Sequence, residues 1–239
     1  MNIINVEHLY KIYGEKIIFD DASFGIQKGD KIGIVGINGT GKSTLLKMIA
    51  GEETPDKGQI IKQNGLNLAY VPQNPVFSED STIRSYALKK GEENWKVESN
   101  LTELNITRFD QKIEHLSGGQ KKRVVLAKIL SDDFDVLLLD EPTNHLDEAM
   151  IRWLEEYLRS YKGTVIMVTH DRYFLDRVTN RILEISHGKM YGYDSDYSGF
   201  LELKAQREEM ESASERKRQS VLRMELEWAK RGCRARTTK

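Results

Sequence analysis

The chain has 239 residues, of which 39% are hydrophobic and 31% charged, and its length suits one α/β domain of about 200 residues with an appendage, or two small domains. A single cysteine, Cys233, excludes an internal disulfide, and the first residues lack the basic segment and apolar run of a signal peptide. No stretch approaches the ~20 apolar residues of a membrane span. We therefore expect a cytoplasmic protein with no membrane insertion.

The net charge of −1 is unevenly distributed. Residues 204–239 contain 11 Lys/Arg and 6 Glu, a net charge of +5, so the first 203 residues carry −6. A basic end of this kind predicts a polyanionic partner, although a solvated helix surface explains the same composition equally well.

The first half of the chain alternates short apolar runs with Gly, Pro and Asp. These runs predict strands at 3–6, 22–26, 31–35, 59–62 and 68–71. A Gly-rich loop, Gly36–Thr44, opens a predicted helix that ends near Ala50. Residues 80–109 are polar and helix-prone, with Trp95, Val97 and Leu101 as apolar anchors. Together with a helix at 118–130 they predict a helical subdomain at about residues 76–130.

The pattern becomes regular after residue 135. Strands are predicted at 136–139 and 164–169, and helices at 148–161 and 172–178. Such alternation predicts an α/β fold with a parallel sheet and helical crossovers. A hairpin at 181–193, turning at His187-Gly188, closes the domain.

A long helix is predicted to follow the domain, because residues 200–231 contain neither Gly nor Pro. It would be ~48 Å long if fully helical. Leu222, Leu226 and Ala229 recur at helical spacing, which indicates a face that requires one partner helix. We expect Gly232 to end this helix. We place the main domain at residues 1–198 and the start of a charged helical linker at 199–239.

One segment fits the pattern G-x-x-x-x-G-K-[ST]: Gly36-Ile37-Asn38-Gly39-Thr40-Gly41-Lys42-Ser43. It follows an apolar strand and precedes a helix, which is the context of a phosphate-binding loop. The glycines allow the backbone N–H groups to surround a phosphate, and the helix N-terminus adds a favourable dipole. We expect Lys42 to reach the β- and γ-phosphates and the Ser43 hydroxyl to ligate Mg²⁺.

Two carboxylates, Asp140 and Glu141, follow the apolar run at 136–139. Ligand sites in open α/β sheets lie at such strand ends. Asp140 suits a Mg²⁺ ligand, and Glu141 suits a base that polarises the attacking water. Taken alone, the pair fits a cap on the next helix equally well; beside a phosphate-binding loop it favours catalysis.

A second anion-binding helix start is predicted at Ser117, Gly118, Gly119 and Gln120, after Leu116. The alternative is a plain helix N-cap at Ser117. Two consecutive glycines would be costly for a cap alone, and this favours the approach of a ligand. One domain cannot easily aim both anion-binding helix starts at the same phosphate chain.

The order of these motifs resembles that of the ABC ATPases over residues 1–195. The resemblance implies a P-loop NTPase fold in which two cassettes clamp two ATP molecules, with Ser117–Gln120 facing the ATP of the other cassette. It implies that Tyr13 stacks on adenine, although an ordinary strand aromatic is the alternative. It also implies that Gln73 lies near Mg²⁺ and the water, and that His170 contacts the γ-phosphate.

The same resemblance implies ATP and Mg²⁺ as bound groups, with Ser43, Gln73 and Asp140 as the metal site. The loop Asn144-His145-Leu146-Asp147 matches the segment through which paired cassettes communicate, and Asp147 is counted with the nucleotide-binding residues.

Two further segments, 141–147 and 169–175, resemble the ABC-F family, and so does the Tyr-Ser-x-Phe-Leu pattern within Tyr191–Leu203. This implies a first cassette followed by the start of an inter-cassette linker, and a role on the ribosome in translation or ribosome assembly. The tail Trp228–Lys239 resembles the linker of the Uup branch, which is connected with DNA and ribosome assembly. The partners implied by both resemblances are the ribosome and its RNA, or alternatively DNA. The main alternative is the nucleotide-binding subunit of a membrane transporter. Intact Glu141 and His170 argue against a third alternative, a non-hydrolysing nucleotide switch.

Overall fold

The computed structural model describes residues 2–78, 80–88 and 94–234. The chain divides into two compact units, Met1–Tyr197 and Ser198–Lys239.

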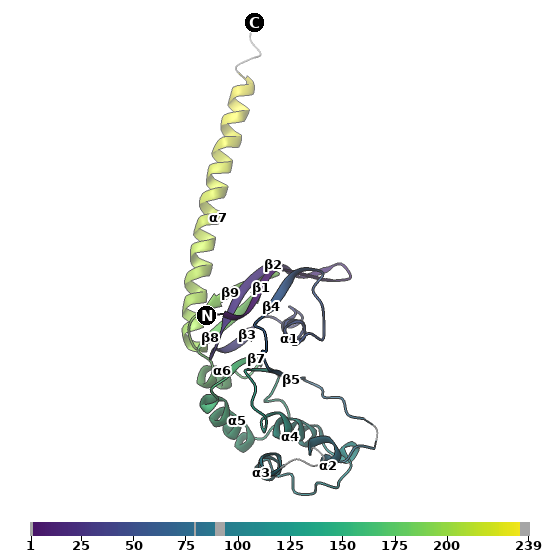
Figure 1. The fold of residues 1–239 in the computed structure, drawn as a ribbon. Helices are drawn as coiled ribbons and strands as arrows, with labels where there is room; N and C mark the ends of the chain where they lie inside the picture. Colours follow the sequence, from purple (N-terminus) through teal and green to yellow (C-terminus); the bar gives the residue numbers. More distant parts are fainter. Residues whose placement is uncertain (1, 79, 89–93, 235–239) are drawn as a thin grey trace. The chain divides into compact units, whose positions relative to one another are not determined.

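The first unit is built around a six-stranded sheet with the order β5-β6-β7-β3-β8-β9 (Figure 1). The strands are β3 (Lys31–Val35), β5 (Leu68–Val71), β6 (Val136–Asp140), β7 (Thr164–Val168), β8 (Arg181–Ser186) and β9 (Lys189–Tyr193). All neighbours are parallel except β8 and β9, which form a hairpin. The prediction of a parallel sheet with helical crossovers is confirmed.

A smaller antiparallel sheet has the order β2-β1-β4, with β1 (Asn2–Tyr13), β2 (Lys16–Gln27) and β4 (Lys57–Lys62). The expected opening strands at 3–6 and 22–26 are too short. β1 alternates buried residues with half-buried or exposed ones along much of its length, because one face of the sheet is more accessible to solvent. The polar residues of the solvated face concealed the continuation of both strands.

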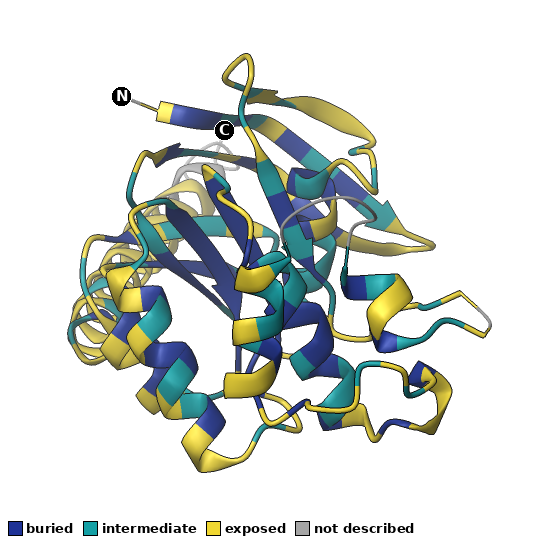
Figure 2. Cartoon of the chain, turned by 60° about the horizontal axis from the view of Figure 1, so that its bottom comes forward, coloured by how far each residue is buried: buried dark blue, intermediate teal, exposed yellow. Residues whose placement is uncertain are grey.

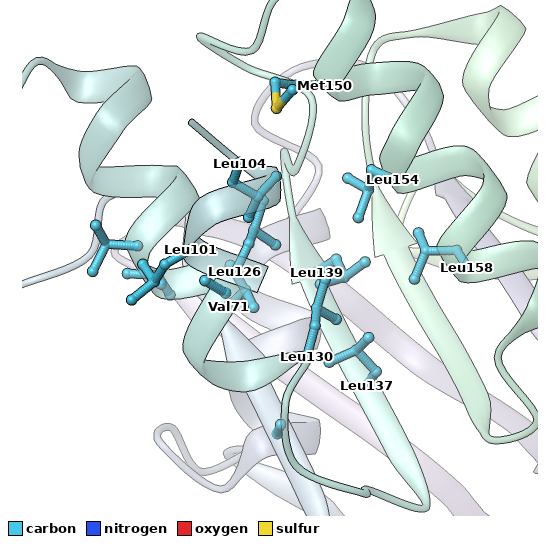
Figure 3. Packing of buried hydrophobic residues seen from close by; sticks show 14 of the residues in the cluster. Val71, Leu101, Leu104, Leu126, Leu130, Leu137, Leu139, Met150, Leu154 and Leu158 are labelled. Atoms are coloured by element: carbon cyan, nitrogen blue, oxygen red, sulfur yellow. The ribbon is translucent and has the colours of Figure 1, made fainter. Parts of the chain in front are cut away.

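The side chains of the parallel strands alternate between two separate cores, as the two-residue period of a strand requires. Leu137 and Leu139 of β6 pack with helices α4 (Gly118–Ile129), α5 (Glu148–Ser160) and α6 (Arg172–Val178). Figure 3 shows these two leucines near Leu154 and Leu158. Val136 and Leu138 face the other core, with helix α1 (Lys42–Ala50) and the antiparallel sheet. Both faces are therefore covered, and strands β6 and β7 are buried throughout (Figure 2).

Between β5 and β6 the described residues contain the helices α2 (Ile83–Ala87), α3 (Trp95–Glu103) and α4, with a 3₁₀ turn η1 (Ile113–His115). Leu101 is fully buried and Val97 packs against the same core, as expected. The expectation for Trp95 is wrong, because its side chain is 63% exposed. Trp95 lies six residues before Leu101, which is a rotation of ~240° about the helix axis, so the two side chains point to different faces. Val97 lies four residues before Leu101 and shares its face.

The second unit contains helix α7 (Tyr197–Arg234). The expectation that Gly232 ends the helix is wrong, because the helical backbone continues to Arg234. A glycine inside a helix costs about 1 kcal/mol relative to alanine, which the neighbouring helix formers offset. Val221, Leu222, Met224, Leu226 and Trp228 are exposed. The predicted motif at residues 235–239 lies outside the described residues.

No helix within the described ranges is long and apolar enough to cross a membrane.

Candidate functional site

The loop between β3 and α1 is shaped by Gly41, which caps the start of α1. Its φ of 98° lies in the left-handed region, which glycine adopts without a steric cost. A Cβ atom at this position would lie 2.2 Å from Cγ2 of Ile18 on β2. Only glycine therefore allows β2 to pack directly under the start of the helix.

Lys42 follows as the first residue of α1, and its side chain turns back over the loop. Its Nζ donates to the carbonyl oxygens of Gly36 at 2.8 Å and of Ile37 at 3.2 Å. Thr40 Oγ1 donates to the same Ile37 carbonyl at 2.9 Å. Burial lowers the pKa of Lys42, against the opposing charges of Glu141 and Asp140. Hydrogen bonds from the side chains of Thr40 and Lys42 to carbonyls of the same loop therefore fix its conformation, and the ammonium of Lys42 is buried.

A cavity of about 420 Å³ opens beside this loop. Residues distant in sequence converge on it from β1, β2, the loop after β5 and the ends of β6 and β7. Its lining consists of Tyr13, Ile18, Asn38, Gly39, Gly41, Lys42, Ser43, Thr44, Gln73, Glu141, Val168 and His170. Most of the predicted nucleotide-binding and catalytic residues therefore meet at one place.

Asp140 ends β6 behind this cavity and is only 2% exposed. Ser43 Oγ donates to Asp140 Oδ1 at 3.0 Å, and the Tyr70 hydroxyl donates to Oδ2 at 3.4 Å. Burial raises the pKa of Asp140, against the opposing hydrogen bond from Ser43. A hydroxyl and a carboxylate oxygen thus converge at the helix start.

These oxygens fit Mg²⁺, which prefers hard oxygen ligands and is usually held by one or two carboxylates together with substrate phosphates. Within the described residues no group of three or more His, Cys, Asp or Glu side chains could hold a metal by itself. Ser43 and Asp140 therefore suit a metal shared with a phosphate-bearing ligand, and Gln73 lines the same cavity.

Glu141 is 4% exposed and has a φ of 48°, in the left-handed region. Such a conformation is uncommon for residues other than glycine and often marks functional sites. His170 approaches from the end of β7, with Nε2 3.4 Å from Glu141 Oε1, and its backbone N donates to Oε2 at 3.4 Å. Burial raises the pKa of Glu141, against the opposing charge of His170. A carboxylate with a raised pKa is a better base towards water.

Tyr13 ends β1 at the rim of the cavity, and 47% of the residue is exposed. Its hydroxyl donates to the carboxylate of Glu53. The buried Lys11 holds the same carboxylate, with Nζ 3.1 Å from Glu53 Oε1. The ring is thus anchored at its hydroxyl while remaining accessible, as a stacking surface for a planar base would need.

The segment from Ser117 to Gln120 is not among the residues that line this cavity. Ser117 Oγ accepts from Gln120 N, and Gln120 Oε1 accepts from Ser117 N, so the two form a capping box. Ser117 therefore acts as a helix N-cap, which was one of the two alternatives. The glycine-rich helix start of the other alternative is present in the same segment. A Cβ on Gly119 would lie 2.3 Å from the carbonyl oxygen of His145, whereas one on Gly118 would meet only the His145 side chain at 3.9 Å. Gly119 is required for packing, and Gly118 is open.

Asp147 also lies apart from the cavity lining. Its Oδ1 accepts from Met150 N and caps α5. Its Oδ2 accepts from Arg123 Nη2 of α4 at 3.2 Å. In this chain Asp147 joins α4 and α5.

Sequence reasoning missed Lys122, which is 2% exposed and whose Nζ donates to the backbone carbonyls of Pro72 and Asp140. A signal was present, because Lys122, Leu126 and Leu130 recur at intervals of four residues along one face. A lysine on that face interrupts the apolar pattern, so the sequence alone does not indicate that it is part of the core.

The fold and the cavity together define a P-loop nucleotide-binding domain. The sequence profile described as ABC transporter matches residues 19–144, and a second profile of the same description matches residues 183–239. The chain belongs to the ABC transporter family of ATP-binding proteins. It carries the ATP-binding and ATP-hydrolysing domain of that family.

Curated relatives include the uncharacterized ABC transporter ATP-binding protein YfmR of Bacillus subtilis, which is 42% identical over 100% of this chain and 45% of that protein. They also include the energy-dependent translational throttle protein EttA of Mycobacterium tuberculosis (35% identical, 99% of this chain, 50% of that protein) and of Haemophilus influenzae (38%, 93% and 48%). These relatives are ABC-F proteins, which confirms the resemblance found in the sequence. The chain spans about half the length of the curated relatives it matches.

Two solved structures share the fold. The ATP-binding subunit of an ABC transporter gives a TM-score of 0.72 at 24% identity, covering 80% of this chain and 90% of that chain. A dimeric ATP-binding cassette in a post-hydrolysis state, bound to ADP and phosphate, gives 0.67 at 23% identity over 80% and 98%.

Proposed function

We propose that this cassette hydrolyses ATP at a site completed by the Ser117–Gln120 segment of a second cassette, and that the closing and opening of the pair acts on the ribosome. The observation that carries the proposal is a division of the predicted residues. Most of the residues predicted to bind phosphate, metal and water line one cavity, while the second glycine-rich helix start lies outside its lining.

The phosphates are bound by the backbone N–H groups of the loop Gly36–Thr44 and by the ammonium of Lys42. Mg²⁺ is held by the oxygens of Ser43 and Asp140 with Gln73 nearby, and when bound it neutralises phosphate charge. Nζ of Lys42 has three donors and gives two of them to loop carbonyls, so any carbonyl contact that it exchanges for a phosphate oxygen is subtracted from the affinity for ATP. Tyr13 stacks on the base.

Glu141 orients and polarises the attacking water, and the burial that raises its pKa makes it a stronger base. His170 contacts the γ-phosphate while its backbone and ring hold the Glu141 carboxylate in place. Both residues follow the carboxyl ends of adjacent parallel strands, β6 and β7, where ligands bind in such sheets.

Completion by a second cassette is supported by the exposure of Ser117 and Gly118. Gly118 is open to a ligand, and Ser117 presents the positive end of the α4 dipole. Asp147, beside this helix start, contributes to the same composite site. The partner is a second cassette of the same protein or a second copy of this chain.

The ribosomal role rests on the ABC-F resemblance and on the translational throttle relatives. Helix α7, with exposed apolar residues and a basic end, is the start of the linker at 199–239 and the candidate contact with RNA, or alternatively with DNA. The place of action is then the cytoplasm.

Completion in trans is tested by mixing two inactive variants. Lys42→Ala lacks the phosphate-binding ammonium, and Gly118→Asp places a carboxylate where the partner's phosphates would approach. Gly118 tolerates a side chain, and an acidic residue suits a helix start, so Gly118→Asp remains folded. The mixture contains pairs with one intact composite site, and we expect it to hydrolyse ATP faster than either variant alone. No gain on mixing would contradict completion in trans.

The ribosomal role is tested with Glu141→Gln, which retains ATP. We expect ATP-dependent co-sedimentation of this variant with ribosomes, and none for Glu141→Gln carrying Lys42→Ala. Retention on permease-bearing membranes with none on ribosomes would instead favour a transporter subunit, while leaving the ATP chemistry intact.

A further inference from the structure

Lys122 is a buried lysine for which the chemistry above has no use. It lies on α4, five residues after Ser117, and is 2% exposed. Its Nζ donates to the carbonyl oxygen of Pro72 and to that of Asp140, both at 3.0 Å. Burying an ammonium is costly unless it is hydrogen-bonded. A leucine would fill this face of α4 without the desolvation cost of a buried charge. The presence of a lysine with two hydrogen bonds therefore indicates a specific role.

The two carbonyls belong to the ends of neighbouring strands. β5 ends at Val71 and β6 ends at Asp140, and the pair is in parallel register with Val71 opposite Leu139. The Pro72 carbonyl immediately precedes Gln73, and the Asp140 carbonyl immediately precedes Glu141. One side chain of α4 therefore joins the backbones from which both of these residues project.

The contact to Asp140 acts on the orientation of Glu141. The carbonyl of Asp140 and the N–H of Glu141 belong to one rigid peptide plane. Lys122 holds the carbonyl, and Glu141 N donates to the Val168 carbonyl at 2.8 Å on β7. The plane is fixed from both sides immediately before a residue whose φ is 48°. Without the ammonium, one of these two restraints is lost.

We propose that Lys122 is a positioning residue, which holds the backbone before Gln73 and before Glu141 so that both side chains reach the bound nucleotide of the same chain. The proposal rests on the roles given to Glu141 and Gln73 above. Lys122 does not touch the nucleotide itself, because it is absent from the residues that line the cavity.

The test compares Lys122→Met, which keeps the length of the side chain and removes the donors, with Lys122→Arg, which keeps donors. Lys121→Met is the matched control, since Lys121 lies beside it on α4 and is only partly buried. We expect Lys122→Met to lower kcat at least tenfold while the Kd for Mg-ATP stays within threefold of wild type. Lys122→Arg should recover most of the rate, and Lys121→Met should not change it. The melting temperature, measured in parallel, gives the folded fraction of each variant.

A merely structural lysine gives another result. Lys122→Met would then lower the melting temperature, and kcat per folded molecule would remain within twofold of wild type, which would overturn the proposal. If Lys122→Met does not fold, Lys122→Gln replaces it, because the amide keeps one donor. The expected order of kcat is wild type, then Arg, then Gln, at similar ATP affinity, and equal values would count against the proposal.

Mixing experiments separate this proposal from the proposed function. In the mixture of Lys42→Ala and Gly118→Asp chains, only the Gly118→Asp chain supplies the working Glu141. Adding Lys122→Met to that chain should lower the rate at least tenfold, and adding it to the Lys42→Ala chain should change it less than twofold. Equal losses in both would overturn the proposal. A mixture without activity, beside a slow Lys122→Met single variant, would contradict completion in trans and leave the positioning role supported.

Discussion

Gly119 on α4 lies so close to the backbone of His145 that a Cβ atom would sit 2.3 Å from the His145 carbonyl oxygen. The start of α4 and the loop before α5 are therefore in contact through backbone atoms.

Gly119→Ala should destabilise the chain, because the new methyl group would clash with the His145 carbonyl. The clash can be relieved only by shifting α4 or the loop before α5. Overpacking of this kind costs typically 1–3 kcal/mol. Gly118→Ala is the matched control, since its Cβ would meet only a side chain at 3.9 Å, and we expect it to be neutral or slightly stabilising. Urea unfolding of the two variants checks this, and equal midpoints would contradict the packing argument.

Lys42→Ala should weaken ATP binding by about 10- to 100-fold, because a hydrogen bond to a charged group contributes about 1.5–3 kcal/mol. The fold should persist, since Lys42 contacts only the carbonyls of its own loop in the described hydrogen bonds. Titration with a fluorescent ATP analogue measures the affinity, with thermal unfolding as the control. Wild-type affinity would place the phosphates elsewhere.

Glu141→Gln should slow phosphate release by about 10²- to 10⁴-fold, the usual contribution of a general base. ATP should still bind, because Lys42, Ser43 and Asp140 are unchanged, and binding should tighten as a charge facing the γ-phosphate is removed. Size-exclusion chromatography with and without ATP should then show more dimer than in the wild type. Unchanged phosphate release would remove Glu141 from the catalytic role.

The partly buried Lys31 should make the stability of the fold increase with pH in the alkaline range. Its Nζ donates to the carbonyls of Tyr161 and Gly163, and burial lowers its pKa to about 8. The unfolded chain therefore holds this proton to higher pH than the folded one, and its contribution to stability rises as the pH increases from about 8 towards the unfolded value of about 10.4.

Urea unfolding at pH 7.5 and 9.5 measures this difference. The gain in stability between the two should be larger in the wild type than in Lys31→Met, by at most ~1.4 kcal/mol per pH unit, the limit for one proton. Lys28→Met, at an exposed neighbouring position, should behave as wild type. The same gain in all three chains would show that Lys31 titrates normally.

The features predictable from sequence were those that depend on local patterns. The short apolar runs at 136–139 and 165–168 favoured buried strands, and the glycine spacing before Lys42 implied the loop that the structure shows. The meeting of Tyr13, Gln73 and His170 in one cavity could be expected only through the family resemblance, because nothing local joins β1 to the end of β7.

Contacts between distant backbones were not predictable. The clash that reserves position 119 for glycine arises from the path of a loop 26 residues further along the chain. Lys122 was missed because its two partners are carbonyls, which every residue carries and which leave no trace in the sequence. Trp95 was misplaced because large apolar residues were counted without regard to the helical face on which each one lies.

The left-handed backbone conformation of Glu141 lowers the stability of the folded chain at this position. A non-glycine residue in that region costs roughly 1–2 kcal/mol, and a carboxylate that is 4% exposed adds a desolvation cost. Replacing Glu141 by glycine would relieve both costs at once. A chain selected for thermal resistance alone would therefore tend to lose this side chain first.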